Sequence, residues 1–479
     1  MNRSDKPREE CAVFGASLFV QEAAGLTYNG LLSMQHRGQE GTGIAVLSGS
    51  NIVCHKDTGL VNEVFTRENL GKIPKSRLAV GHNRYSTTGR SVHINLQPFV
   101  TEYLTGRIAA VHNGNVTNAG KIKRQLMARG LNFNATSDTE VIASLIAYHC
   151  MREKDALEGV IRAADELEGA FTLIILSSEK KLIAVRDGSG YRPLCLGRGG
   201  AGLVVASESC ALDSCGFRFV RDVRPGEVVV IENGEVTFEE VVLKKKDPSS
   251  GLCIFEYVYF ARPDSDIDGL SVYEARHNMG RVLAQEHPVA ADAVCGVPDS
   301  GLEAAIGYAS ESGLPLVSGF VKNRYIGRSF IFPTQSERES AVKMKLNPLR
   351  ANLQDKSIVL VDDSIVRGTT SEKIVTALKQ AGAREVHMRI SSPPFRYACY
   401  FGTDIDTEEN LIANKMDLTA IRDKIGADSL GYISIGGLKS ACEKAVLPFC
   451  TKCFTGHGHH YDYDRAGAPR DTKRMEGRA

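Results

Sequence analysis

The chain contains no tryptophan, and its 479 residues include no apolar run of the roughly 20 residues that a membrane-spanning helix needs. Its net charge is close to zero, because 58 Lys and Arg stand against 57 Asp and Glu, mixed along the chain rather than gathered in blocks. This balance gives no reason to expect nucleic acid or a membrane as a partner. The first ten residues are polar and lack the apolar core of a secretory signal.

Cysteine, in contrast, is not scarce. Twelve cysteines in a chain without a secretory signal are expected to be thiols of a reducing, cytoplasmic protein, unless some of them bind a metal. With 43% hydrophobic residues, the chain is long enough for two or three domains with cores of their own.

One stretch, residues 357–382, combines several signals. A β-branched apolar run, SIVLV, is typical of a buried strand and stops at Asp362 and Asp363. A small polar loop, residues 364–371, then leads into an amphipathic helical pattern and suits a phosphate at the helix N-terminus. Because carboxylates repel phosphate, the acidic pair is expected to face sugar hydroxyls or a metal ion. The pattern predicts a 5-phosphoribosyl ligand; the alternative is an ordinary capped helix.

The same stretch resembles the phosphoribosyl pyrophosphate (PRPP) loop of type I phosphoribosyltransferases. Residues 298–301, PDSG, are similar to the pyrophosphate loop of that family, so Ser300 joins Asp362 and Asp363 as a candidate Mg²⁺ ligand, with a plain turn as the alternative. The resemblance implies that PRPP is bound by Asp362, Asp363, Ser364, Arg367, Gly368, Thr369, Thr370 and Ser371.

Strand-like and helix-like segments alternate around this stretch, which predicts a parallel sheet with helices between its strands. The expected strands are residues 293–301, 314–321, 357–363 and 385–394. Upstream, a charged and then Pro/Ser/Gly-containing stretch at residues 244–251 is typical of a linker.

Cys11 opens an apolar, strand-like run near the N-terminus. If the chain were cleaved before it, Cys11 would carry a thiol beside an α-amino group, and one residue could act as nucleophile and base. Taken alone, such a cysteine is more commonly part of a core.

Four later segments change this interpretation: residues 29–45, 80–90, 109–118 and 135–146. Together with Cys11 they resemble the N-terminal-nucleophile glutaminase domain of class II glutamine amidotransferases, and the similarity extends to about residue 242. The resemblance implies an αββα sandwich in which Cys11 attacks the glutamine amide. It also implies that Arg84 binds the substrate carboxylate, Asn113 and Gly114 form the oxyanion hole, and Asp138 binds the substrate ammonium.

Each of these residues has a structural alternative. Arg84 could form a surface salt bridge, and Asn113 with Gly114 could form a hairpin turn, because Asn-Gly is a strong hairpin signal. Asp138 could cap a helix beginning at Thr139. All four occurring together and in order favours the glutaminase interpretation.

Over residues 11–456 the chain resembles the PRPP amidotransferase family, which implies that ammonia from glutamine displaces pyrophosphate from PRPP at the start of purine synthesis. Feedback by purine nucleotides and a homotetramer are implied as well. The basic stretch at residues 322–350 is similar to a loop that closes over pyrophosphate. Two alternatives are a salvage phosphoribosyltransferase with a decayed glutaminase domain and a non-catalytic nucleotide-sensing or iron–sulfur protein.

The cysteines add a metal prediction. Cys450 and Cys453 form a CxxC pair, which could be a redox pair or half of a zinc site. Cys253 and Cys399 match the remaining cluster ligands of the iron–sulfur subclass of this family. Four thiolates suit Zn²⁺ or a [4Fe–4S] cluster, and the resemblance favours a cluster of structural role. Cys442, in an apolar helical pattern, is left out of the set.

The predicted organisation is mixed α/β and α+β. Residues 1–10 are expected to be a propeptide, residues 11–243 the N-terminal-nucleophile glutaminase sandwich, residues 252–456 the type I phosphoribosyltransferase domain, and residues 457–479 a C-terminal tail.

Overall fold

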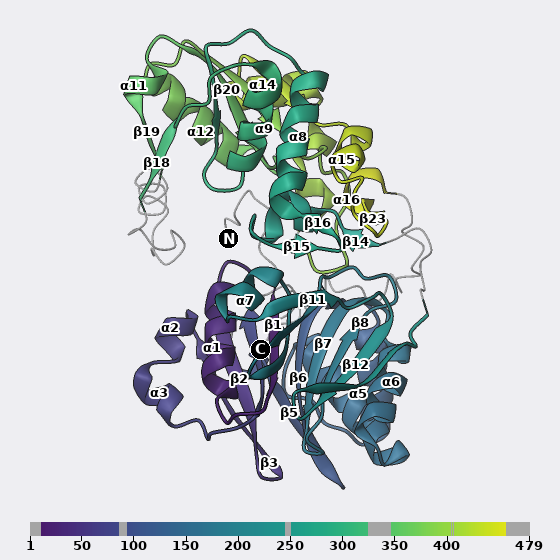
Figure 1. Ribbon diagram of the computed structural model, residues 1–479. Coiled ribbons are helices and arrows are strands. Elements are labelled where there is room, and N and C mark those ends of the chain that lie inside the picture. The colour runs from purple at the N-terminus through teal and green to yellow at the C-terminus, as the bar shows by residue number, and fades with distance from the viewer. Residues whose placement is uncertain are drawn as a thin grey trace.

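The computed structural model describes residues 11–85, 93–244, 251–323, 346–403, 405 and 407–456. The chain forms a first unit, residues 11–244, and a second unit, residues 251–456, which are the lower and upper parts of Figure 1. The predicted propeptide and C-terminal tail lie outside the described residues. So do most of the predicted linker and most of the basic stretch at residues 322–350.

The first unit contains two antiparallel sheets that pack face to face. The seven-stranded sheet has the order β11-β9-β10-β1-β4-β2-β3, and the six-stranded sheet has the order β13-β12-β8-β7-β6-β5. The strands of the first sheet are β1 (Ala12–Leu18), β2 (Gly41–Ser48), β3 (Asn51–Thr58), β4 (Leu78–Arg84), β9 (Cys195–Gly199), β10 (Gly202–Ala206) and β11 (Arg218–Asp222). Those of the second are β5 (Phe99–Tyr103), β6 (Gly106–Val116), β7 (Gly169–Ser177), β8 (Leu182–Arg186), β12 (Glu227–Glu232) and β13 (Glu235–Val241).

Helices cover the outer faces of both sheets (Figure 1). In β1, Val13 packs between the sheets while Phe14 faces the helices on the outside, so the strand is apolar on both faces. The helices beside the first sheet are α1 (Ala23–Ser33), α2 (Val61–Val64), α3 (Arg67–Gly71) and α7 (Ser209–Ser214). Those beside the second are α4 (Ala119–Ala128), α5 (Asp138–Glu153) and α6 (Ala156–Glu166). The predicted αββα sandwich is confirmed.

The second unit is built on a parallel sheet with the order β17-β20-β21-β22. Its strands are β17 (Ala293–Gly296), β20 (Ser357–Asp362), β21 (Glu385–Ile390) and β22 (Ser429–Tyr432). In β20, Val359 and Val361 face the core beneath α8 (Val272–Glu286), α9 (Leu302–Ser312) and α15 (Ile435–Ala441). Ile358 and Leu360 face the core beneath α12 (Thr369–Gln380) and α14 (Leu418–Ile425). The predicted parallel-sheet architecture is confirmed.

One predicted strand of this sheet is wrong. Within residues 314–321, only Leu316 forms a parallel bridge, to Val294, and the segment then turns into β18 (Phe320–Lys322), which pairs antiparallel with β19 (Leu346–Pro348). The bridge consists of the Val294 N–H donating to the Pro315 carbonyl oxygen and the Val317 N–H donating to the Val294 carbonyl oxygen, and Pro315, which has no N–H, cannot extend it on the N-terminal side. The fourth parallel strand is instead the short β22.

The remaining elements are short. They are η1 (His93–Asn95), β14 (Leu252–Cys253), η2 (Glu256–Phe260), β15 (Asp266–Ile267), β16 (Leu270–Ser271), α11 (Arg350–Leu353), η4 (Glu408–Asn410), α13 (Ile412–Lys415), β23 (Phe449–Cys450) and α16 (Lys452–Thr455).

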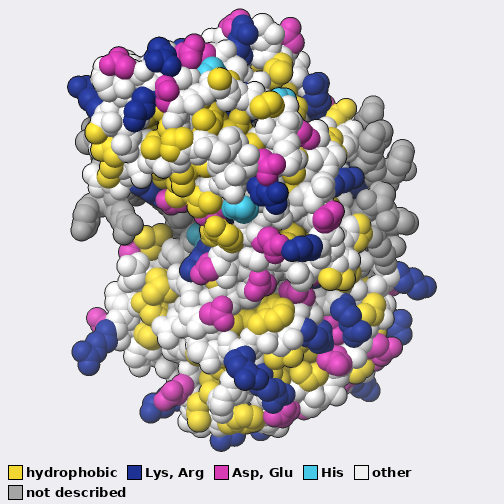
Figure 2. Space-filling model, turned by 45° about the horizontal axis from the view of Figure 1, so that its top comes forward, with side chains coloured by type: hydrophobic (Ala, Val, Ile, Leu, Met, Phe, Trp, Pro, Cys, Tyr) yellow, Lys and Arg dark blue, Asp and Glu magenta, His cyan; other side chains and the backbone are white. Residues whose placement is uncertain are grey.

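Cationic and anionic side chains are interspersed over the face shown in Figure 2, as expected from the balanced composition. Across the described part of the chain, no helix has both the length and the apolar character needed to cross a membrane.

Candidate active sites

Cys11 lies directly before β1, at the edge where β4 ends. Ala12 pairs with Asn83 of β4, which brings Cys11 beside Arg84 and Tyr85. The Tyr85 N–H donates to the Cys11 Sγ at 3.4 Å, and the thiol lies 3.3 Å from the Tyr85 carbonyl oxygen. The cysteine is therefore buried, but its sulfur lies among backbone polar groups.

Arg84 and Asp138 are both buried close to this edge. Arg84 donates from Nη1 to the Asn95 carbonyl at 3.0 Å, so the alternative of a surface salt bridge is wrong. The Asp138 Oδ2 accepts the Val116 N–H at 3.1 Å and lies 3.6 Å from the His112 Nδ1. Burial alone would raise the pKa of Asp138, but His112, the Val116 N–H and Arg84 together lower it. The carboxylate therefore stays ionised and suits an ammonium ligand.

The capping alternative for Asp138 is also wrong. Helix α5 begins at Asp138 itself, and its N-cap is Ser137, whose hydroxyl oxygen accepts the Thr139 N–H at 3.3 Å. The Asp138 side chain instead reaches the end of β6 through Val116.

Asn113 and Gly114 do not form a hairpin turn. They lie within β6 and are paired with Thr172 and Phe171 of β7. Gly114 has φ of +136°, and a Cβ at this position would lie 2.1 Å from the Ala170 carbonyl oxygen, so the position requires glycine.

The Asn113 side chain is fully buried, and neither its Nδ2 nor its Oδ1 has a hydrogen-bond partner among the described residues. Buried amides are nearly always paired in proteins. An exception beside Gly114 fits an amide whose partner is a ligand.

Three residues that the sequence analysis missed join the two sheets behind this edge. The His82 Nε2 in β4 lies 3.2 Å from the His112 carbonyl oxygen in β6. The Gln97 side chain bonds to both backbone groups of His112: its Nε2 donates to the His112 carbonyl oxygen at 3.2 Å, and its Oε1 accepts the His112 N–H at 2.6 Å. Burial, followed by Arg84, lowers the pKa of His82, which keeps its ring neutral. The sequence could have indicated a role for His82 and His112, because each lies within two residues of a predicted site residue, Arg84 or Asn113.

A second candidate site lies where β17 and β20 end in the second unit. The Asp362 Oδ1 accepts the Asp363 N–H at 2.9 Å, and both carboxylates are buried. Two hydroxyls donate to Asp363, from Ser300 to Oδ1 and from Ser364 to Oδ2, each at 2.5 Å. The PDSG loop and the acidic pair are thus brought together at the carboxyl edge of the parallel sheet, where ligands of such sheets bind.

The predicted phosphate loop connects this edge to α12. Gly368, with φ of +87°, is the N-cap, and α12 begins at Thr369. Thr369 is exposed, Thr370 and Arg367 are half-buried, and Ser371 is buried. The first N–H groups of a twelve-residue helix therefore adjoin the loop, the arrangement that binds phosphates in other proteins.

The second site suits Mg²⁺ in its donor chemistry. Ser300, Asp362 and Asp363 supply oxygen atoms, which Mg²⁺ prefers. Among the described residues no group of three or more His, Cys, Asp or Glu side chains could hold a metal by itself. In proteins Mg²⁺ is usually held by one or two carboxylates together with substrate phosphates.

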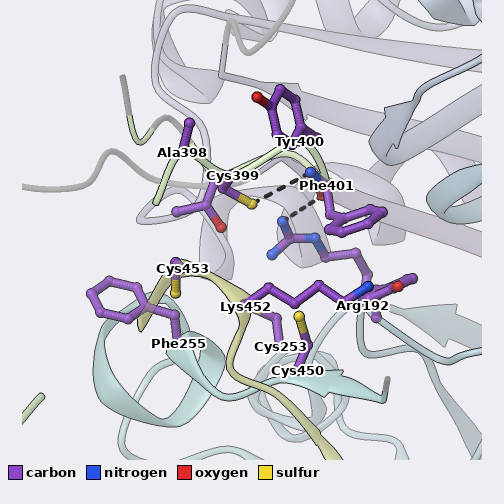
Figure 3. Close-up of a pocket in the computed structure, with 12 residues that line it drawn as sticks. Arg192, Cys253, Phe255, Ala398, Cys399, Tyr400, Phe401, Cys450, Lys452 and Cys453 are labelled. Atoms are coloured by element: carbon purple, nitrogen blue, oxygen red, sulfur yellow. Dashed lines mark hydrogen bonds between the residues drawn. The ribbon is translucent and has the colours of Figure 1, made fainter. Parts of the chain in front are cut away.

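All four predicted cluster cysteines line one cavity (Figure 3). Cys253 in β14 and Cys450 in β23 are neighbours in a parallel strand pair, Cys453 is the second residue of α16, and Cys399 comes from a separate loop. The Cys399 Sγ accepts the Phe401 N–H at 3.4 Å. Cys442 instead packs in the apolar core of the second unit, as its exclusion from the set predicted.

Four cysteine thiols in one cavity are a donor set that suits a [4Fe–4S] cluster or a zinc ion. Burial raises the pKa of Cys253 and Cys453, and the neighbouring thiols raise both further, so the four sulfurs are close enough to repel as thiolates. Arg192 and Lys452 also line the cavity and would balance the negative charge of a thiolate cluster.

Comparison with known proteins gives concordant matches over both units. Residues 82–214 match the glutamine amidotransferase domain family, and residues 271–391 match the phosphoribosyl transferase domain family. The chain is 48% identical to an amidophosphoribosyltransferase of Archaeoglobus fulgidus, over 90% of this chain and 93% of the relative. It is 44% identical to that of Bacillus subtilis, over 94% of each chain.

Two solved structures are similar along nearly the whole chain. Glutamine PRPP amidotransferase from B. subtilis, complexed with ADP and GMP, gives a TM-score of 0.86 at 42% identity and covers 96% of this chain and 99% of its own. A structure described as the allosteric regulatory enzyme of purine biosynthesis gives a TM-score of 0.87 at 43% identity, covering 96% and 98%.

Proposed function

The chain belongs to the amidophosphoribosyltransferase family, and from this premise we propose how its residues divide the reaction between two sites. The enzyme converts PRPP, glutamine and water into 5-phosphoribosylamine, glutamate and pyrophosphate, the first committed step of purine biosynthesis. The two alternatives, a salvage transferase and a non-catalytic binding protein, are wrong, because the relatives over the whole length are amidophosphoribosyltransferases.

We propose that glutamine is hydrolysed in the first unit. The Cys11 sulfur attacks the side-chain amide carbon, and Arg84 and Asp138 hold the substrate carboxylate and ammonium. The negative charge that develops on the amide oxygen is stabilised by the Asn113 Nδ2–H and the Gly114 N–H. The observation that carries this proposal is the fully buried Asn113 amide, which has no partner among the described residues.

The α-amino group of Cys11 is the proposed base. Once residues 1–10 are removed, this amine accepts the thiol proton as sulfur attacks and returns it to the departing ammonia. Cleavage before Cys11 is therefore part of the proposal.

Ammonia then reacts with PRPP in the second unit. Ser364, Gly368, Thr369, Thr370 and Ser371 surround the 5-phosphate, and Arg367 adds a positive charge at the loop. Ser300, Asp362 and Asp363 would hold Mg²⁺, which when bound neutralises charge on the leaving pyrophosphate. The nitrogen of ammonia bonds to the anomeric carbon as the bond to pyrophosphate breaks, and this step needs no protein nucleophile.

We propose further that Cys253, Cys399, Cys450 and Cys453 bind a [4Fe–4S] cluster of structural role. The support is their common cavity and their position, because β14 and β23 join the beginning of the second unit to its end. None of the twelve cysteines, all of which lie within the described residues, forms a disulfide, which supports a reducing, cytoplasmic location. The B. subtilis complex with ADP and GMP supports regulation by purine nucleotides. A homotetramer stays a prediction from the family resemblance.

Anaerobic purification followed by metal analysis and intact mass tests these proposals. We expect about four irons per chain, a visible absorption band and the mass of a chain that starts at Cys11. Cys450→Ser should lose the iron, whereas Cys442→Ser, the matched control in the core, should keep it. Stoichiometric zinc without iron would contradict the cluster, and active enzyme that still begins at Met1 would contradict the role of Cys11.

A further inference from the structure

A buried arginine connects Cys11 to the second unit. Arg37 follows α1 in the first unit, and its Nε–H donates to the Cys11 carbonyl oxygen at 3.1 Å. Its two terminal nitrogens donate to the two carboxylate oxygens of Glu256, each at 2.9 Å. Glu256 is the first residue of η2 and belongs to the second unit. Both side chains are completely buried, so the pair has no access to water.

Two further charges complete this network. The Arg37 Nη1 also donates to Glu208 Oε1 at 2.6 Å, and the Arg192 Nη1 donates to Glu256 Oε1 at 3.2 Å. Arg192 reaches on to the Phe401 carbonyl oxygen at 2.8 Å, in the loop that carries Cys399 (Figure 3). Two guanidinium groups are thus balanced by two carboxylates, all of them buried.

The charges of Arg37 and Glu208 are stable. Burial alone would lower the pKa of Arg37, but Glu256 and Glu208 raise it above its usual value. Burial alone would raise the pKa of Glu208, but His36 and Arg37 hold it well below its usual range. Arg37 and Glu208 therefore stay ionised across the range in which an enzyme works.

We infer that Glu256 is a positioning residue for the glutaminase site, acting through the Arg37 guanidinium on the backbone of Cys11. This inference rests on the proposed role of Cys11. An N-terminal residue is joined to the chain by one peptide bond only. A hydrogen bond to its carbonyl oxygen fixes the plane of that peptide, and with it the position of the Cα atom that carries both the thiol and the amine. A bidentate carboxylate fixes the plane of the guanidinium and hence the direction of the Nε–H. The second unit thereby contributes to the geometry of the nucleophile in the first.

The alternative is that the network only holds the two units together. A second buried pair across the same boundary separates the two possibilities. Arg186 in the first unit donates from Nη1 and Nη2 to both carboxylate oxygens of Asp268 in the second, each at 2.8 Å. This pair is also buried, with the Asp268 side chain 5% exposed, and the other hydrogen bonds of Arg186 go to the backbone oxygens of Val223, Gly190 and Arg192 and not to Cys11.

The test compares Glu256→Gln with Asp268→Asn in the full chain. Each variant replaces a buried carboxylate by an amide of the same shape. The readouts are kcat and KM for glutamine, the rate of synthesis from added ammonia, and the rate at which Cys11 is alkylated by an electrophilic glutamine analogue. Small misplacements of a reacting group can cost about 100-fold in rate.

We expect Glu256→Gln to lower the glutamine-dependent kcat and the alkylation rate about 10- to 100-fold, with synthesis from ammonia and the KM for glutamine little changed. Asp268→Asn should leave the ratio of glutamine-dependent to ammonia-dependent synthesis as in the wild type. The inference is overturned if Glu256→Gln leaves that ratio unchanged, or if both variants lower it equally.

Two more variants cover the remaining outcomes. If Glu256→Gln does not fold, Glu256→Asp keeps the charge but shortens the side chain, and it must lower the same ratio; an unchanged ratio overturns the inference. Cys11→Ala is measured in parallel. If Cys11→Ala still uses glutamine, the proposed function itself is overturned. If Cys11→Ala loses glutamine use but Glu256→Gln keeps it in full, only the positioning role of Glu256 is overturned.

Discussion

Asn113 is a buried residue whose side-chain amide has no hydrogen-bond partner among the described residues. A buried polar group without a partner costs about 1–3 kcal/mol, so a fold seldom keeps one that has no use. The sequence showed Asn-Gly, which locally favours a hairpin, yet the pairing of β6 with β7 places both residues inside a ladder. The motif was informative about function, but the local conformation could not be predicted, because the partner strand lies more than 50 residues downstream.

At this scale, Asn113→Ala removes one donor to the oxyanion. We expect kcat for glutamine hydrolysis to fall about 100- to 1,000-fold. Synthesis from added ammonia should be unchanged, because the second site is intact. Asn118→Ala is the control, since that amide bonds to Glu166 and Glu168 backbone groups away from Cys11. Steady-state kinetics with glutamine and with ammonia as the nitrogen source measures both effects. Glutamine turnover at the wild-type rate in Asn113→Ala would contradict the role of Asn113 in the oxyanion hole.

The elements of the second unit show what a sequence pattern can and cannot predict. The apolar run of β20, the acidic pair and the start of α12 were predictable because strand, loop and cap signals occur within one short stretch. The prediction of a strand around Pro315 was wrong, because Pro315 has no N–H to extend the ladder on its N-terminal side and the chain beyond Leu316 pairs with β19 instead. Strand β22 was missed because its four residues, SLGY, are too short and too weakly apolar to give a period.

The geometry of strand β6 requires glycine at position 114, and two Gly→Ala variants test this requirement. Gly114→Ala forces a Cβ to within 2.1 Å of the Ala170 carbonyl at a positive φ, so we expect the free energy of unfolding to fall by more than about 2 kcal/mol. Gly25→Ala, inside α1 with no atom within 4 Å of the new Cβ, should raise it by about 0.5–1 kcal/mol. Thermal or denaturant unfolding measures both, and equal effects of the two substitutions would contradict the strand geometry.

The two ends of β20 give a matched test of the PRPP site. Asp363→Asn at the carboxyl end removes a charge proposed to act on Mg²⁺ and PRPP, and the loss of a charged hydrogen bond, about 1.5–3 kcal/mol, predicts a roughly 10- to 150-fold lower kcat/KM for PRPP. Asp355→Asn, just before the other end, alters an exposed carboxylate and should have no effect. Rates of ammonia-dependent synthesis at varied PRPP concentration give kcat/KM for PRPP in each variant. Equal kinetics for the two variants would exclude Asp363 from the site.

On the scale of the whole molecule, two folds are joined by buried charges. The motifs predicted both folds, and the candidate residues that they supplied for each site lie close together in the structure, because each motif is local. They could not predict the contact of Arg37 with Glu256, which are 219 residues apart, since each is an unremarkable charged residue in its own segment. The four cysteines were predictable only through the resemblance, because their approach depends on the pairing of β14 with β23.

The central claim is that one chain carries two separable reactions, glutamine hydrolysis at Cys11 and ammonia transfer at the loop before α12. It is tested most directly by pyrophosphate release from PRPP with the Cys11→Ala variant, supplied first with glutamine and then with ammonia. The account predicts no release with glutamine and release at the wild-type rate with ammonia. Continued release with glutamine, or loss of both reactions in a folded variant, would contradict it.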